Sequence, residues 1–478
     1  MKKKQIPIII LLVILVQITL QLIIPIHTIA AEEIVTIQCN DINFYNRLIE
    51  ELEGKIQSKN DTEKTITMTK TNVESVTDIK FDNYYHGTDE SLWITDITGI
   101  ENFINLRTLY LRYNNISDIS ALSGLTKLTE LRLDGNEISD ISALSGLTNL
   151  TDLDLDSNNI SEISALSGLT NLKRLYLSYN EISDINALSG LTNLTDLRLY
   201  SNNISDISGL SGLTNLTNLD LASNEITDIS ALFGLTNLVT LNLRGNNISD
   251  IDLLARLTNL SSLYLGGNGI RELDALSNLK KLEELHLEGN NLSDISTIAN
   301  LINLKLLNLC SNNIENITPI GSNVNLETLY IGGNELNDIS ILKNLSKLTT
   351  LDIAGNNIHD ISVLTQLNNL KSLILSSCTT RSISPNMVGV YGSNPLKDGY
   401  LEVISKLTGL KELCIEMANI TNIECLSTLT NLTELSVSRN KITDINAISG
   451  LTNLTDLNLG SNNISDISVL SGLTNLTD

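Results

Sequence analysis

The sequence predicts an α/β repeat solenoid, a curved stack of short turns with a parallel sheet on its inner side and a thin 3₁₀ or coil wall outside. Three observations support this prediction. Asn recurs every 22 residues along most of the chain, and a Leu-x-Leu pair precedes most of these asparagines while Ile and Leu follow at fixed offsets. Aromatic residues are only 4% of a chain that is 42% hydrophobic. The core must therefore be built from Leu and Ile, as a repeat array allows.

The Asn positions predict a ladder of hydrogen bonds. A buried amide needs partners, and the backbone groups of neighbouring turns supply them. Cys378 takes one Asn place, because Cys is small and tolerates burial, and Ala418 takes the next, where we expect a weak point since its methyl group neither donates nor accepts. The ladder residues are Asn114, Asn136, Asn158, Asn180, Asn202, Asn224, Asn246, Asn268, Asn290, Asn312, Asn334, Asn356, Asn440 and Asn462.

Each repeat divides into three parts. Leu153-x-Leu155 is typical of a short strand whose alternate residues point inward, and successive strands should stack in parallel about 4.8 Å apart. Ile160 and Ile163 would fill the floor of the core, and the group around Leu166 its back. The segment left for the outer side is too short for a long α-helix, so that 3₁₀ turns or coil are expected there.

The first part of the chain carries an export signal and a cap. Basic residues at 2–4, an apolar run at 6–26 and small residues up to Ala31 predict a signal peptide cleaved near Ala30 or Ala31. The alternative is an uncleaved membrane anchor, since the run is long enough to span a bilayer. In both cases the rest of the chain lies outside the cytoplasm.

The cap should begin with a helix that starts at Asp41. Its apolar stripe would be Phe44, Leu48, Leu52 and Ile56. Residues 65–69 alternate like a strand, residues 79–81 look like a first Leu-x-Leu, and residues 82–93 are an irregular insertion. We therefore divide the chain into a signal peptide (1–31), an N-terminal cap with a first partial repeat (32–98) and the repeat array (99–478).

Two irregularities interrupt or end the array. An insertion at 386–403 contains an expected loop at 387–398 and then an expected helical face on the convex side, Leu401, Ile404 and Leu407. It is either a contact loop or a tolerated insertion, of which repeat arrays accept many. The chain stops within a repeat and a C-terminal cap is absent. We therefore expect a fragment, a truncated chain or one completed by another chain.

Composition argues against several classes of function. The formal net charge of −24 disfavours a nucleic-acid partner. The scattered cysteines form no zinc motif, and Cys310 and Cys414 fall at outward positions, where we expect exposed free thiols. No catalytic motif is present. His286, with Glu284 and Glu288, is interpreted as a solvated polar cluster and not as a catalytic or metal site. We expect no enzyme, no cofactor and no metal.

The acidic residue that follows Ser or Thr in nearly every repeat has two interpretations. Asp118, Asp140 and Asp206 occupy this place in three repeats. Each carboxylate can cap the following turn by accepting from backbone N–H groups. The alternative is a line of weak Ca²⁺ contacts, although no EF-hand pattern accompanies it.

The repeat Leu-Thr-Asn-Leu-Thr-x-Leu-x-Leu-x-x-Asn-x-Ile-Ser-Asp-Ile is the leucine-rich-repeat signature. With the signal peptide and the helical cap, it resembles the internalin family of bacterial surface proteins over residues 40–478. The resemblance implies a curved right-handed superhelix, on a Gram-positive-type surface or secreted from it, whose concave face recognises a host or other protein. The repeat is also similar to that of a cytosolic phosphatase-regulator family, but the export signal argues against that role.

Two departures from the internalin pattern stand out. No immunoglobulin-like domain and no LPxTG wall-sorting signal follow the repeats, which puts surface anchoring in doubt. Ala121, Ala143 and Ala165 stand where internalins usually have Pro. Neither departure affects the expected fold.

Side chains that point out of the strands predict a protein-binding patch. Tyr and Arg dominate interface energies, and they gather on the first repeats. The simpler reading is that these positions merely tolerate both residue types. Later repeats present Gly266 and Gly332 at these positions, which predicts a flatter face there. The predicted binding residues are Tyr110, Arg112, Tyr113, Arg132, Arg174, Tyr176, Tyr179, Arg198, Tyr200, Arg244 and Tyr264.

The sequence therefore predicts an exported or cell-surface scaffold, monomeric, that binds an extracellular protein. Any contact with a membrane would be through an uncleaved N-terminal segment. The alternative is a structural cell-envelope or self-association module without a foreign partner. The pattern does not name the partner.

Overall fold

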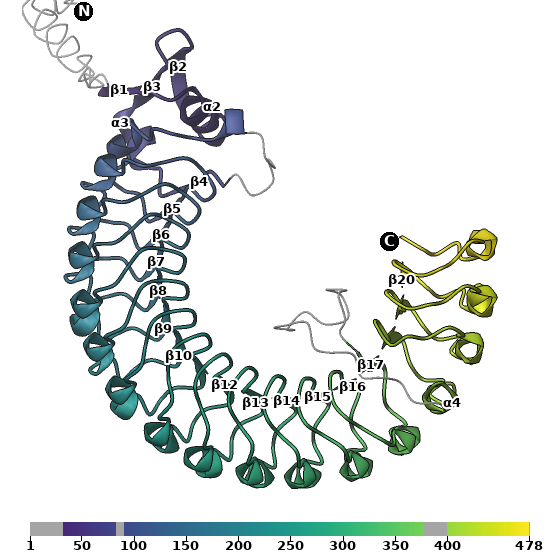
Figure 1. The fold of residues 1–478 in the computed structure, drawn as a ribbon. Helices are drawn as coiled ribbons and strands as arrows, with labels where there is room; N and C mark the ends of the chain where they lie inside the picture. Colours follow the sequence, from purple (N-terminus) through teal and green to yellow (C-terminus); the bar gives the residue numbers. More distant parts are fainter. Residues whose placement is uncertain (1–31, 83–89, 377–398, 478) are drawn as a thin grey trace, which may run out of the picture.

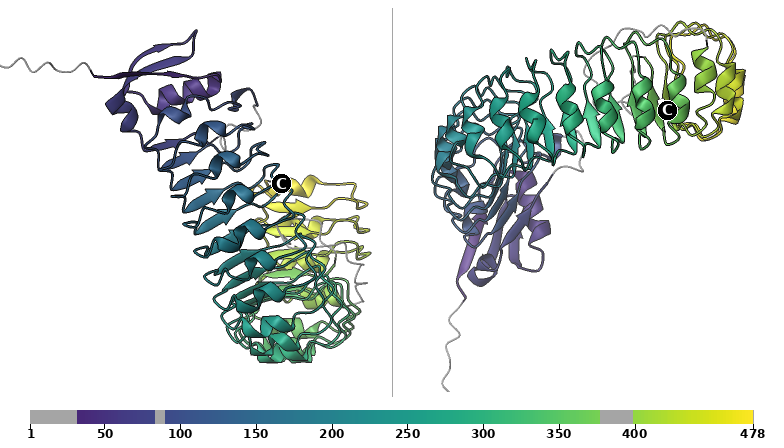
Figure 2. Two further views of the ribbon diagram at one scale, coloured as in Figure 1. Left: turned by 90° about the vertical axis from the view of Figure 1, so that its left-hand side faces the viewer. Right: turned by 90° about the horizontal axis from the view of Figure 1, so that it is seen from below.

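The computed structural model describes residues 32–82, 90–376 and 399–477. They form an open arc with short strands along its inner curve and 3₁₀ turns along its outer curve (Figure 1). Two further views show that the arc also rises out of its own plane (Figure 2). The segments predicted to be a signal peptide and the 387–398 loop lie outside the described residues, as does Cys378.

A parallel sheet runs through the whole array. Strands β4 to β20 pair in chain order, and the central residue of each strand, a leucine in all but β4, faces that of the next, as Leu197 faces Leu219. The strands are β4 Asp78–Lys80, β5 Thr108–Tyr110, β6 Glu130–Arg132, β7 Asp152–Asp154, β8 Arg174–Tyr176, β9 Asp196–Arg198, β10 Asn218–Asp220, β11 Thr240–Asn242, β12 Ser262–Tyr264, β13 Glu284–His286, β14 Leu306–Asn308, β15 Thr328–Tyr330, β16 Thr350–Asp352, β17 Ser372–Ile374, β18 Glu412–Cys414, β19 Glu434–Ser436 and β20 Asp456–Asn458.

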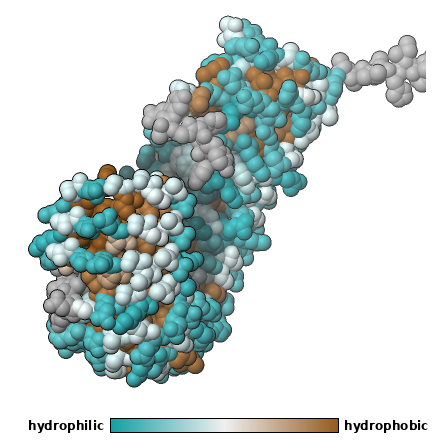
Figure 3. All heavy atoms as spheres, turned by 90° about the vertical axis from the view of Figure 1, so that its right-hand side faces the viewer, coloured by the Kyte–Doolittle hydropathy of each residue, from teal (hydrophilic) through white to brown (hydrophobic). Residues whose placement is uncertain are grey.

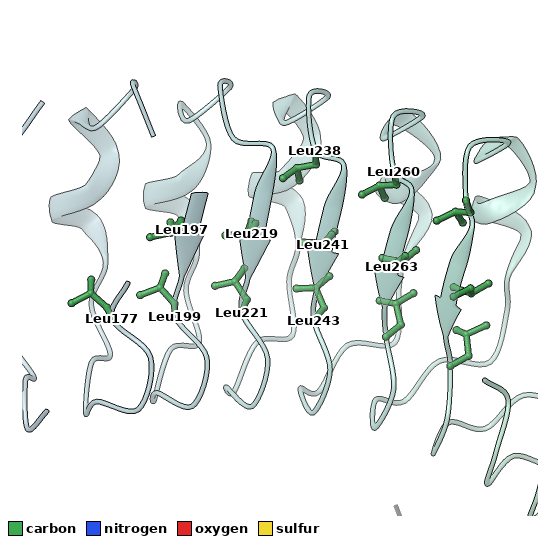
Figure 4. Close-up of a cluster of buried hydrophobic side chains, with 14 of the residues drawn as sticks. Leu177, Leu197, Leu199, Leu219, Leu221, Leu238, Leu241, Leu243, Leu260 and Leu263 are labelled. Carbon is green, nitrogen blue, oxygen red and sulfur yellow. The ribbon is translucent and has the colours of Figure 1, made fainter. Parts of the chain in front are cut away.

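The core consists of stacked rows of aliphatic side chains. Figure 4 shows one row through Leu197, Leu219 and Leu241 and a second through Leu199 and Leu221, all pointing to the same side of the sheet. Most of these leucines are fully buried. Full burial of a leucine contributes about 1.5–3 kcal/mol. Because each row continues through every repeat, the array needs no separate globular core.

The ladder asparagines bond to their own turn and to the preceding one. The Asn202 amide donates to the carbonyl groups of Leu177 (2.9 Å) and Leu199 (3.1 Å) and accepts from the N–H of Ile182 (2.9 Å). The same bonds recur from Asn136 onward. At Ala418 the side chain can make none of them, and the Oδ1 atom of Asn440 accepts from the N–H groups of both Ala418 (2.9 Å) and Ile420 (3.1 Å).

The outer side is made of 3₁₀ turns, from Ile100–Asn102 to Ser468–Gly472, as predicted. An exposed carboxylate caps most of them: Asp206 accepts from the N–H of Ser208 at 2.8 Å. Asn422 does the same with its amide oxygen, for Glu424 at 2.7 Å. The acidic residue thus acts as a turn cap. Within the described ranges, no group of three His, Cys, Asp or Glu residues is arranged to hold a metal ion.

The outer surface is mostly hydrophilic. Figure 3 shows the side of the molecule that lies at the right of Figure 1, where hydrophobic residues gather in small groups between hydrophilic ones. In the last described repeat Ile467 is 63% exposed. None of the helices in the described part of the chain has the length and apolar character that a membrane crossing requires.

The N-terminal cap is a small sheet with two helices. Strands β1 (Ile34–Gln38) and β2 (Ile56–Asn60) pair antiparallel with β3 (Thr65–Thr69). Asp41 caps helix α2 (Ile42–Glu51) by accepting from two backbone N–H groups, as predicted. Ile56 was wrongly assigned to the helical stripe: helix α2 ends at Glu51, and Ile56 begins a strand the sequence pattern did not reveal. The second cap helix is α3 (Lys70–Glu74).

Two further local features fix the array. At Gly99, φ is 110°, and a Cβ atom there would lie 2.8 Å from the carbonyl oxygen of Gln38. Only glycine therefore allows strand β1 of the cap to approach the first turn. At the end of the insertion, helix α4 (Tyr400–Ile404) lies on the outer side and includes Leu401 and the fully buried Ile404 of the expected helical face, whereas Leu407 is buried beyond the end of the helix (Figure 1).

Candidate functional site

The outward side chains of the sheet form three columns along the concave face, one before, one between and one after the leucine pair of each strand. The parallel register places Arg132, Asp154, Tyr176 and Arg198 side by side in the middle column. Tyr110 and Tyr264 lie in the same column, Arg174 lies in the column before it, and Arg112, Tyr200 and Arg244 lie in the column after it. The sheet thus brings most of the predicted binding residues onto one surface.

The aromatic and arginine side chains of this surface contact one another and so fix one another in place. The Arg198 guanidinium lies 4.2 Å from the centre of the Tyr176 ring, and the Tyr176 hydroxyl donates to Asp196 at 3.0 Å. Arg132 lies 4.8 Å from the Tyr110 ring centre. Side chains that are already fixed lose little entropy on binding, which favours affinity.

Sequence reasoning missed two members of this network. Glu130 accepts from the Tyr110 hydroxyl at 2.7 Å and from Arg132 at 2.8 Å. Lys80 lies 4.8 Å from the centre of the same tyrosine ring. Both occupy outward positions of their strands. A search for opposite charges two residues apart, as in Glu130 and Arg132, would have found the first of them.

Tyr113 and Tyr179 lie at the edge of the concave face in a strained conformation. They occupy the position before the ladder asparagine, where φ is 55° and 54°, respectively, and where other repeats often use glycine. A bulky residue rarely adopts this conformation, and such strain concentrates at functional sites. Tyr179 is 53% exposed, and its ring contacts that of Tyr200 edge-on, with 4.8 Å between the ring centres. Both tyrosines therefore present aromatic surface to solvent at an energetic cost.

The repeat of strand β7 presents a carboxylate in all three columns: Asp152 and Asp154 in the strand and Asp156 just after it. Burial raises the pKa of Asp154 to about 7, and the nearby Asp134 and Asp156 add to the rise. Burial also raises the pKa of Asp156 to about 6. The concave face therefore holds negative charge that its surroundings stabilise poorly.

We predict that Asp154→Asn stabilises the protein at pH 8 but not at pH 4. The raised pKa means that the folded state binds more protons than the unfolded state between pH 4 and about 7, so that Asp154 lowers stability as pH rises through this window. Because Asp154 keeps part of its surface in water, we expect a gain of only about 1–2 kcal/mol at pH 8. Urea denaturation at both pH values measures it.

The matched control is Asp206→Asn. The backbone N–H of Ser208 lowers the pKa of Asp206, so that this carboxylate favours the folded state once it is ionised. Its replacement should therefore give no gain at pH 8. An equal gain from both variants would mean that the effect is one of net charge and not of the surroundings of Asp154.

The expectation of a solvated cluster at His286 was wrong. His286 and Glu288 are 5% and 2% exposed. Glu288 extends over Gly266 of the neighbouring strand to reach Arg244, with 3.3 Å between the Arg244 Nε and Glu288 Oε1 atoms. A Cβ atom on Gly266 would lie 2.2 Å from that oxygen. The glycine therefore does not flatten the face, because a side chain from the next repeat fills its space.

His286 is held from the other side as well. Its Nε2 atom lies 2.9 Å from a Glu284 oxygen, and its ring stacks on Tyr264 with 4.6 Å between the ring centres. At Gly332, as at Gly266, a side chain from the next repeat fills the space over the glycine. A Cβ atom on Gly332 would lie 3.0 Å from the Asp352 carboxylate. The prediction of a flatter face at these two glycines was therefore also wrong.

Cys310 and Cys414 occupy concave positions as expected, but they are buried and not exposed. They pack with Ala354 and Ile374 into a second apolar cluster, against which Tyr330 lies. Small apolar side chains from neighbouring strands cover one another there. Solvent exposure at an outward position depends on these neighbours as well as on the direction of the side chain.

A model of the family "Leucine Rich repeats (2 copies)" matches overlapping segments from 104–146 to 258–300 and again residues 430–475, together just over half of the chain. A single-copy "Leucine Rich repeat" model matches residues 344–364. No curated protein sequence matches the chain.

Solved structures share the fold. An internalin of Listeria monocytogenes, inlF, is 29% identical, with 91% of this chain and 94% of that chain covered and a TM-score of 0.50. A leucine-rich-repeat protein of Leptospira interrogans is 25% identical, with 85% and 96% covered and a TM-score of 0.60. The ectodomain of the Arabidopsis thaliana receptor kinase GASSHO1/SCHENGEN3 is 21% identical, with 77% and 45% covered and a TM-score of 0.58, and is similar in fold alone.

The repeat spacing, the continuous parallel sheet and these matches agree. Proteins of this fold are typically scaffolds for protein interaction. The chain belongs to the leucine-rich-repeat family, and its repeats are internalin-like.

Proposed function

We propose that this protein is an exported or cell-surface scaffold that binds an extracellular protein through the first half of its concave face. The observation that carries the proposal is the network around Tyr176, Arg198 and Tyr200, where aromatic and arginine side chains are fixed by their own neighbours. Rigid Tyr and Arg side chains at the centre of a concave surface are the usual source of binding energy in protein interfaces. The strained and exposed Tyr179 adds aromatic area beside them.

The proposal gives the protein a binding role and no catalysis. The likeness to an internalin supports a secreted or surface location and a protein partner. The predicted signal peptide would deliver the array there. We propose that the array acts as a monomer, with the N-terminal cap protecting the first repeat.

We predict that replacing Tyr176, Arg198 and Tyr200 together with alanine weakens partner binding at least about 100-fold, because centrally placed residues of these types each contribute about 2 kcal/mol or more. The measurement is capture of proteins from host-cell surface extracts, with identification of what is captured and an affinity for the purified partner. The matched control is Ser167→Ala, Ser189→Ala and Ser211→Ala, three exposed serines of the 3₁₀ side. Unchanged binding by the concave variant, with the control also unchanged, would place the interface elsewhere.

A self-association or envelope role predicts a different result. In that case the purified protein assembles as its concentration rises, and no foreign protein depends on Tyr176, Arg198 and Tyr200 for capture. Sizing chromatography over a range of concentrations separates the two roles. A concentration-independent monomer that captures a foreign protein supports the binding scaffold.

A further inference from the structure

The cations of the concave face are already paired within the chain. Arg112 contacts Asp134 with Nε 2.8 Å from Oδ1, Arg132 contacts Glu130 at 2.8 Å, and Arg198 contacts Asp196 at 3.8 Å. Arg174 pairs with Asp152 and Arg244 with Glu288. Every predicted binding arginine thus has an acidic partner of its own. A partner that relied on free arginines, such as an acidic peptide or a phosphate, would first have to break these pairs.

Several carboxylates of the same face have no ion-pair partner of their own. Asp154, Asp156 and Asp220 form no ion pair with any residue in the described ranges. Asp154 accepts from the backbone N–H of Asp156 at 3.2 Å, Asp156 from that of Ser178, and Asp220 from that of Ala222 at 3.0 Å. Burial raises the pKa of Asp220, as it does for the other two. The sheet face from β7 to β10 therefore carries carboxylates that receive only longer-range attraction from Arg112 and Arg198, each of which is paired with another acidic residue.

The surroundings of Asp154 have the form of a shallow receptor for a side chain. A hollow of about 40 Å³ is lined by Arg132, Asp152, Asp154, Arg174 and Tyr176 together with the strand leucines. It is too small for a folded segment but sits beside the half-buried Tyr176 ring. Because the Arg198 guanidinium already lies over the Tyr176 ring, a further cation in this hollow would be attracted by the Asp154 carboxylate.

We propose that the partner presents a lysine or arginine side chain to Asp154 and Asp156 at the centre of this sheet face. The inference rests on the proposed function, because it names the chemistry of the partner bound at the same surface. Charge complementarity supports it: the face can gain from a cation that the partner brings, while its own arginines are engaged. The cationic group would lie over strand β7 with Tyr176 beside it, and the rest of the partner would cover the tyrosines of the neighbouring strands.

The experiment uses pentalysine and pentaglutamate as probes against the full-length purified protein, in calorimetric titrations at about 0.15 M salt, where long-range attraction is screened. We expect pentalysine to bind, and the double variant Asp154→Asn/Asp156→Asn to bind it at least about tenfold more weakly. The control variant is Asp206→Asn/Asp228→Asn. In titrations at pH 8, above the raised pKa values of Asp154 and Asp156, it removes about the same charge from the turn caps, where Asn already serves at Asn316 and Asn422, and it should change the affinity less than about twofold.

Equal weakening in both variants would overturn the proposal, because the attraction would then be that of the whole acidic chain. The proposal would also be overturned if pentaglutamate bound more tightly than pentalysine, or if neither probe bound. The proposed function can fail separately. If a captured partner depends on Tyr176, Arg198 and Tyr200 but not on Asp154 and Asp156, the binding face stands and the basic partner does not. If pentalysine binds at Asp154 but no captured protein depends on the tyrosines, the site for a basic side chain stands and the protein-binding face does not.

Discussion

An Asn202→Ala protein unfolds about 3 kcal/mol more easily than the wild type. The change removes two bonds to carbonyl groups and leaves the buried N–H of Ile182 without its acceptor. A buried polar group without a partner costs about 1–3 kcal/mol, and the backbone of a stacked turn has little freedom to find water instead. Urea denaturation measures the loss.

Asn203→Ala is the control for this prediction. Asn203 is the next residue, exposed where Asn202 is buried. Its replacement should cost less than about 0.5 kcal/mol, as for most surface changes. Equal losses for the two variants would show that the ladder amides contribute no more than any polar residue of the turn.

Leu219→Ala is expected to cost about 3–4 kcal/mol. Leu219 is 1% exposed in the middle of the array, with the leucines of the two neighbouring strands on either side. Truncation removes buried hydrocarbon and leaves a cavity that the regular stack cannot close. Denaturation monitored by circular dichroism gives the value.

Leu457→Ala tests the physical cause of that cost. Leu457 holds the same place in strand β20 but is only partly buried, because within the described residues β20 pairs with a strand, β19, on one side alone. Its replacement should cost less than half as much as Leu219→Ala. Equal costs would mean that contacts between neighbouring repeats are not the source of stability.

The repeat pattern alone predicted most of the fold because each residue's environment repeats with the chain. Leu197, Leu219 and Leu241 occupy one row since they share one place in the period (Figure 4). Asp41 was recognisable as a helix cap from its neighbours in sequence. The strand that begins at Ile56 was not recognisable, because nothing in the local pattern shows that the helix ends before this residue.

The candidate site was less predictable, since its contacts join side chains across repeats. The period tells that Glu288 points outward, but not that it crosses Gly266 to meet Arg244 two strands away. Cys310 and Cys414 are likewise covered by neighbours whose size, and not whose position, decides burial. Direction is a property of the repeat, whereas exposure and charge pairing are properties of particular combinations of residues.

The unbroken in-register pairing has a consequence for how such a chain can change in length. Adding or deleting one whole unit of 22 residues would give each turn on either side a neighbour equivalent to the one it lost. Tandem duplication can therefore lengthen the arc without inventing an interface. Each added unit would leave the surface next to the cap unchanged while carrying the opposite end further round the curve.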